Sequence, residues 1–119
     1  MKQIIYRNQL SESKTAFSNL ANIQLARLFH LTEPDSIKFR NHTFDSRDKY
    51  KNIYELKTTT HKEYYLKYKR NPLILLNKTK KDNIIYLDFI LVGFFDLDKN
   101  KITHAFLYNM HNKLIEKEM

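Results

Sequence analysis

The most informative part of the chain covers residues 45–60 and reads DSRDKYKNIYELKTTT. Residues 36–48 and 52–59 have the composition of β-strands, with apolar and β-branched side chains between polar ones. The polar residues 49–51 separate them and are typical of a hairpin tip. The sequence therefore predicts a β-hairpin with a three-residue tip.

This hairpin brings two carboxylates and one lysine together. Three tip residues pair Asp45 with Glu55 across the hairpin. Lys57 leaves the strand on the same face as Glu55, because alternate residues of a strand share a face. Two carboxylates at cross-strand distance repel each other unless a cation lies between them. The hairpin therefore predicts a site for a divalent metal ion.

Mg²⁺ is the cation that suits such a site. It prefers carboxylate oxygens, keeps several of its waters and accepts phosphate oxygens. It can therefore activate a water and stabilise the departing oxygen of a phosphodiester. Lys57 would supply positive charge where negative charge develops in the transition state, and would help to position the attacking water.

Two other aspartates are alternatives to Asp45. A two-residue tip would pair Asp48 with Ile53 and bring the Asp48 carboxylate to the face of Glu55. Residues 34–35 form a Pro-Asp pair as well, although the chain after them would then have to loop back to reach Glu55. We expect Asp45 to be the ligand, with Asp48 as the alternative.

At these residues the chain resembles the PD-(D/E)xK nuclease superfamily, and more closely the blunt-cutting type II restriction endonucleases of the Pvu kind. The resemblance rests on Asp45, Asp48 and the run YELK at 54–57, and covers about residues 17–115. The run NPLI at 71–74 and Gln24, in a leucine-rich helix, extend it. The resemblance implies that Asp45 and Glu55 bind the metal and that Lys57 is the catalytic lysine. It also implies a restriction-endonuclease-like mixed β-sheet flanked by helices.

The chain departs from these enzymes at two places. Residues 68–70 read Tyr-Lys-Arg where the family has a histidine-rich stretch before Asn-Pro, so base recognition is expected to differ. The hairpin tip also lacks the usual glycine, which leaves its register open.

Basic residues are concentrated in the middle of the chain. The sequence has 21 Lys and Arg against 13 Asp and Glu, a formal net charge of +8. Residues 38–81 hold 13 basic and 4 acidic residues, whereas the remainder holds 8 and 9. Such a field suits nucleic acid, an anionic membrane surface or an acidic partner. Together with the resemblance to restriction endonucleases, this charge leads us to expect double-stranded DNA as the partner.

Candidate DNA contacts follow the hairpin. Residues 61–70 alternate aromatic and basic side chains, a pattern that leaves helix and loop both open. The candidate contacts, which could stack on bases or hold phosphates, are Lys67, Tyr68, Lys69 and Arg70. Alternatively, the tyrosines of this segment pack in the core or in a dimer interface. Gln24 is expected either to contact DNA or the active site, or to make a buried hydrogen bond.

The remaining elements follow from periodicity. Residues 13–30 predict a helix whose apolar stripe consists of Phe17, Leu20, Ala21, Leu25 and Leu28. Residues 32–35 predict a turn. An apolar run at 73–76 and a charged turn at 77–83 are followed by an expected strand at 84–95, buried on both faces. We then expect a turn at 96–100, a strand at 101–108 and a terminal helix at 109–119.

We therefore expect a single α/β nuclease domain over residues 1–119. The absence of cysteine excludes disulfides, thiolate nucleophiles and Cys-ligated zinc sites. With no apolar run of transmembrane length and no leader-like start, we expect a cytoplasmic protein with no membrane partner. The expected activity is Mg²⁺-dependent cleavage of double-stranded DNA by a homodimer at a short palindrome. A junction-resolvase-like nuclease and a catalytically inactive nucleic-acid-binding module are the alternatives.

Overall fold

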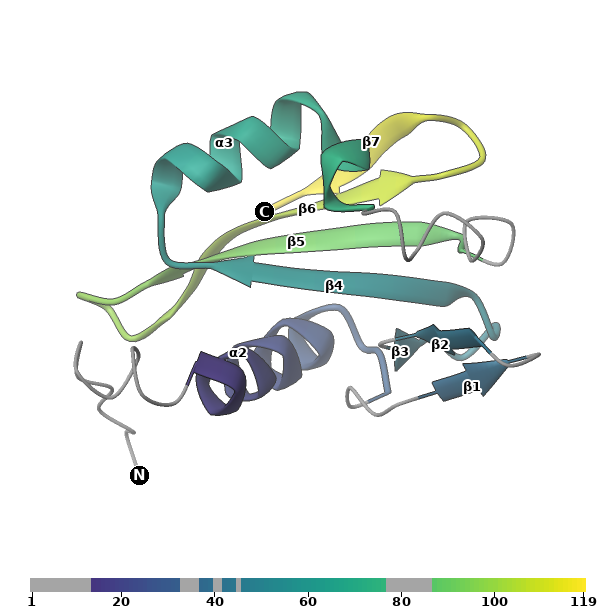
Figure 1. Cartoon of the computed structure of the whole chain (residues 1–119), viewed down its shortest axis with the longest axis horizontal. Helices are drawn as coiled ribbons and strands as arrows, with labels where there is room; N and C mark the ends of the chain where they lie inside the picture. Colours follow the sequence, from purple (N-terminus) through teal and green to yellow (C-terminus); the bar gives the residue numbers. More distant parts are fainter. Residues whose placement is uncertain (1–13, 33–36, 40–41, 45, 77–86) are drawn as a thin grey trace.

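The computed structural model describes residues 14–32, 37–39, 42–44, 46–76 and 87–119 (Figure 1). In this part of the chain, five strands form one sheet in the order β3-β4-β5-β6-β7. Their bounds are β3 (Ser46–Arg47), β4 (Ile53–Thr59), β5 (Phe89–Asp96), β6 (Lys101–Asn109) and β7 (Leu114–Glu118). β4 and β5 run parallel, whereas the other neighbours are antiparallel. The predicted mixed sheet is therefore present.

Two helices cover opposite faces of this sheet (Figure 1). α2 (Lys14–Leu28) precedes the strands, and α3 (Lys62–Arg70) connects β4 to β5 and is followed by the 3₁₀ helix η1 (Pro72–Leu75). Parallel neighbouring strands need such a crossover, and here it decides the open choice at 61–70 in favour of a helix. The molecule is α/β, in agreement with the predicted fold class at that level.

Alternation along β4 and β5 produces one core on each side of the sheet. The α2-side core consists of Ala21, Leu25, Ala26, Tyr54, Leu56, Leu91, Phe95, Ile102, Ala105 and Leu107. The α3-side core consists of Ile53, Tyr65, Leu87, Ile90, Val92, Phe106 and Tyr108. β5 contributes to both, so the strand predicted to be buried on both faces is confirmed from Phe89 onward.

The predicted apolar stripe of the first helix is only partly correct. Leu25 is fully buried, but Leu20 and Leu28 are 42% and 46% exposed. Ala21 of the predicted stripe is buried as expected, and Ala26, which lies outside that stripe, is buried as well. Small side chains allow the helix to approach the sheet closely, so the buried face is rotated away from the larger leucines.

The single strand expected at 36–48 is wrong. Two short strands, β1 (Ile37–Phe39) and β2 (His42–Phe44), pair with each other as a separate antiparallel sheet, and only β3 joins the main sheet. A strand of thirteen residues would have been unusually long, since globular strands average five to six residues.

The terminal helix expected at 109–119 is also wrong. The chain turns at 110–113 and returns as β7, antiparallel to β6. Oδ1 of Asn109 accepts hydrogen bonds from the backbone N–H groups of His111 and Asn112, and Lys113 has a left-handed φ of 58°. Pairing with the edge of an existing sheet thus outweighs the helical propensity of the segment LIEKE.

Candidate active site

The register of the β3–β4 hairpin is the one predicted with a three-residue tip. Arg47 pairs with Ile53, and Ser46 pairs with Tyr54. The backbone N–H of Asp48 donates to the carbonyl of Asn52 at 3.3 Å, which closes the hairpin around residues 49–51. The predicted pairing of Asp45 with Glu55 belongs to this register, but Asp45 lies outside the described residues and its role stays a prediction. The Pro-Asp pair at 34–35 also lies outside them.

Glu55 and Lys57 lie on the same face of β4. Ile53 belongs to the α3-side core, whereas Tyr54 and Leu56 belong to the α2-side core, so the odd-numbered residues of β4 share the α3 side. Glu55 is 6% exposed and is placed next to Ile90 of β5. Lys57 is exposed and is placed next to Val92. A buried carboxylate and an accessible ammonium group are therefore neighbours along one strand.

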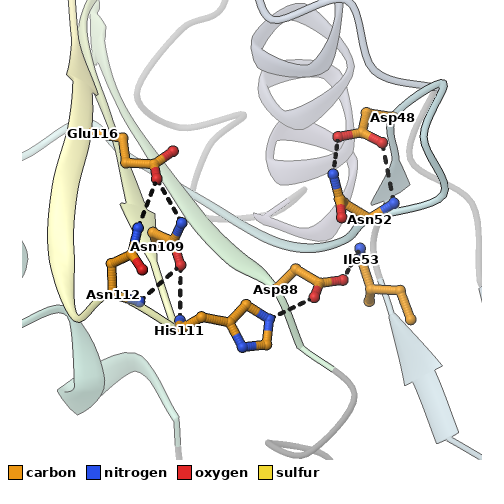
Figure 2. A network of polar contacts seen from close by, with 8 residues as sticks. All are labelled: Asp48, Asn52, Ile53, Asp88, Asn109, His111, Asn112 and Glu116. Atoms are coloured by element: carbon orange, nitrogen blue, oxygen red, sulfur yellow. Dashed lines mark hydrogen bonds and ion pairs between the residues drawn. The ribbon is translucent and has the colours of Figure 1, made fainter.

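The carboxylate of Asp48, the alternative metal ligand, accepts hydrogen bonds within the hairpin (Figure 2). Its Oδ1 accepts hydrogen bonds from the backbone N–H groups of Tyr50 and Asn52, at 2.8 and 3.0 Å. Its Oδ2 accepts hydrogen bonds from Asn52 Nδ2 and the Tyr54 hydroxyl, each at 2.8 Å. Burial raises its pKa, but these hydrogen bonds outweigh burial and lower the pKa below its ordinary value.

The two-residue tip that would turn Asp48 toward Glu55 is thus not formed. The Asp48 carboxylate binds Tyr54, whose ring packs in the α2-side core, on the other side of the sheet from Glu55. Burial and the negative charge of Asp48 raise the pKa of Tyr54, so its hydroxyl stays protonated as the donor. Asp48 therefore stabilises the tip and does not share a face with Glu55.

The structure divides the candidate DNA contacts on α3 into two groups. Lys67 and Arg70 are exposed on the outer surface of the helix. Tyr68 packs partly against the α3-side core, and Lys69 forms an ion pair with Glu118 of β7. Only Lys67 and Arg70 are thus directed to solvent without a partner in the described chain.

Tyr65 and Gln24 both make contacts inside the folded domain. Tyr65 is buried against Phe94, Phe106 and His104, and burial raises its pKa to about 12. Gln24 Oε1 accepts a 2.9 Å hydrogen bond from the backbone N–H of Ile102, beside a register shift in the β5–β6 pairing. This partly buried hydrogen bond agrees with the structural role expected for Gln24, and the expected contact with DNA stays a prediction.

Asp88 lies beside the candidate site, and the sequence prediction gave it no role (Figure 2). It lies directly before β5, and its carboxylate contacts both Ile53 at the start of β4 and His111 in the β6–β7 turn. The available signal was a single charged residue inside the otherwise apolar run 84–95. The sequence offered no indication of its partners, because they are 35 and 23 residues away.

Within the described ranges, no group of three or more His, Asp or Glu side chains is arranged to hold a metal ion. The predicted pair includes Asp45, which those ranges leave out. Among the described helices, none is long and apolar enough to cross a membrane. Comparison with known protein families, curated proteins and solved structures finds no match to this chain.

Proposed function

We propose that this protein is a Mg²⁺-dependent endonuclease that hydrolyses phosphodiester bonds of double-stranded DNA. One observation carries the proposal: a buried carboxylate, Glu55, and an exposed lysine, Lys57, lie two residues apart on one face of β4, an interior strand of the sheet. The hairpin register, in which Asp45 is expected to face Glu55, supports it. The finer expectation, a restriction-endonuclease-like fold acting as a cytoplasmic homodimer, is part of the same proposal.

The donor set suits Mg²⁺. Glu55 offers a carboxylate shielded from bulk water, and Asp45 is the expected second oxygen ligand. A bound Mg²⁺ would supply an activated water and stabilise the departing oxygen. Lys57 would hold the attacking water or a phosphate oxygen through its ammonium group, where negative charge grows in the transition state.

α3 is the proposed DNA-contacting element. Lys67 and Arg70 are three residues apart, so their side chains are neighbours on the exposed surface of the helix. Tyr64 is exposed on the preceding turn at the same spacing. Two cations and one aromatic ring on one side of a helix can hold phosphates and pack against the sugar or a base.

The homodimer follows from the symmetry of duplex cleavage. Each Glu55 and Lys57 pair would cut one strand, so cutting both strands at a palindrome needs two copies related by a two-fold axis. Cuts placed symmetrically on the two strands are the expected product.

The test is incubation of the purified protein with supercoiled plasmid and Mg²⁺, followed by sequencing of the ends. The proposal predicts linear DNA with ends at one short palindromic sequence. Cleavage confined to four-way junctions would favour the junction-resolvase-like alternative. Binding without cleavage in both Mg²⁺ and Mn²⁺ would favour the inactive binding module, and would contradict the proposal.

A further inference from the structure

Asp88 holds both backbone groups of Ile53, at the start of the strand that carries Glu55 and Lys57. Its own backbone N–H donates to the carbonyl of Ile53 at 3.0 Å. Its side-chain Oδ2 accepts the Ile53 N–H at 2.8 Å. The regular pairing of β4 with β5 begins one residue later, at Tyr54 and Phe89. The Asp88 carboxylate therefore extends the hydrogen bonding between β4 and β5 by one residue, because it accepts the Ile53 N–H in place of a backbone carbonyl.

Asp88 is also held by the β6–β7 turn, on the side of β5 away from β4 (Figure 2). Its Oδ1 lies 2.7 Å from Nε2 of His111, and its carbonyl accepts the N–H of Met110 at 2.9 Å. The turn that carries these two residues is braced by Asn109, whose Oδ1 accepts the N–H groups of His111 and Asn112. Asp88 is thus a fixed bridge between the beginning of β4 and the β6–β7 turn.

This bridge acts close to the proposed metal ligand. Ile53 and Glu55 lie on the same face of β4, two residues and therefore about 7 Å apart along the strand. A catalytic group tolerates only about 0.5 Å of displacement before its productive geometry is lost. Within the described residues, β3 pairs with β4 only at Ile53 and Tyr54, and Glu55 pairs with β5 alone, at Ile90. Loosening at Ile53 is therefore expected to reach Glu55 through Tyr54, the first residue of the β4–β5 ladder.

We propose that Asp88 is a positioning residue for Glu55, and that it acts through the backbone of Ile53 with His111 as its brace. The inference rests on the proposed function, since it assigns Glu55 to a metal site. Asp88 itself would touch neither the metal nor the DNA.

The test compares Asp88→Ala and Asp88→Asn in the full chain. Asp96→Ala is the matched control, because the Asp96 carboxylate also accepts backbone N–H groups, from Asp98 and Lys99, but in the turn that follows β5. Three quantities are measured for each protein: amide hydrogen exchange at residues 53–55, Mg²⁺ affinity by calorimetry, and cleavage rate.

Asp88→Ala should speed exchange at 53–55 and weaken Mg²⁺ affinity by about tenfold or more, the usual effect of losing a residue that orients a ligand. Asp88→Asn should restore most of both, since its amide oxygen can still accept the Ile53 N–H. Asp96→Ala should change neither. Two results for Asp88→Ala would overturn the inference: unchanged hydrogen exchange at 53–55, or faster exchange with unchanged Mg²⁺ affinity. The proposed function would still hold in both cases if the wild type binds Mg²⁺ and cleaves DNA. A wild type that neither binds Mg²⁺ nor cleaves DNA would overturn the proposed function, and the inference with it.

Discussion

The hydroxyl of Tyr54 donates a 2.8 Å hydrogen bond to Oδ2 of Asp48, across the base of the β3–β4 hairpin. Asp48 also accepts hydrogen bonds from the tip that it precedes, so one carboxylate joins the tip to the strand. Since Tyr54 and Glu55 are successive residues of β4, they take opposite faces of the sheet. The hydrogen bond therefore holds Asp48 on the face of the sheet opposite to Glu55, the carboxylate proposed to bind the metal.

Protonation of Asp48 should make the protein less stable in acid. Its pKa is lowered in the folded protein, so its stabilisation is complete above the ordinary aspartate pKa of about 4 and is lost as the pH falls through the lowered value. The free energies of unfolding of the wild type and of Asp48→Ala should therefore differ at neutral pH and converge as the pH falls below the lowered pKa of Asp48. A difference that stayed constant over this range would show that the ionised carboxylate contributes nothing.

Metal binding should distinguish Asp45 from Asp48. Asp45→Asn should abolish detectable Mg²⁺ binding, because Mg²⁺ is held through few protein oxygens and one of two charged ligands would be neutralised. Asp48→Asn should leave Mg²⁺ affinity close to that of the wild type, since its carboxylate serves the tip. Calorimetric titration measures both, and the reverse ranking would mean that the ligand has been assigned to the wrong aspartate.

The salt dependence of DNA binding should depend on Lys67 and Arg70 more than on Lys69. Each phosphate contact contributes about 0.9 to the slope of log affinity against log salt concentration. Replacing Lys67 and Arg70 together by Ala should reduce the slope by about 1.8. Lys69→Ala, which removes the partner of Glu118, should leave the slope nearly unchanged. Equal effects from all three positions would show that Lys69 leaves its ion pair when DNA binds.

Gly93 should be required for the close contact between α2 and the sheet. A Cβ atom added at Gly93 would lie 3.0 Å from Cδ1 and 3.3 Å from Cδ2 of Leu25, which is fully buried. Gly93→Ala should therefore destabilise the protein by about 1–3 kcal/mol, as overpacking of a core does. Thermal unfolding measures this cost, and a combined Gly93→Ala and Leu25→Ala variant should lose less stability than the sum of the single changes.

Much of the sheet could be predicted from the sequence because its signals are local. Strands β4 and β6 have clear boundaries, and the polar residues 49–51 fix the hairpin tip. The alternation of aromatic and basic residues at 61–70 leaves helix and loop both open, because it has neither a clear helical nor a clear strand period. Its helical state is determined by the crossover between two parallel strands, which is a tertiary requirement.

The incorrect predictions also result from tertiary contacts that the local sequence does not show. Residues 114–118 read LIEKE, which favours a helix locally, but the turn braced by Asn109 directs them to the edge of β6. For the candidate site, the spacing of Glu55 and Lys57 predicts their shared face of β4, and their role stays a prediction. Asp88 was missed because its importance comes from Ile53 and His111, both distant in sequence.

Lys57→Ala tests the central claim most directly, with Lys99→Ala, an exposed lysine in the β5–β6 turn, as the control. Cleavage of plasmid DNA in Mg²⁺ is measured beside DNA affinity and thermal stability. We predict that Lys57→Ala slows cleavage by at least about a hundredfold while DNA binding and stability remain close to wild type, because its charge acts mainly in the transition state. Lys99→Ala should cleave normally. Cleavage by Lys57→Ala at the wild-type rate would contradict the assignment of Glu55 and Lys57 as a nuclease active site.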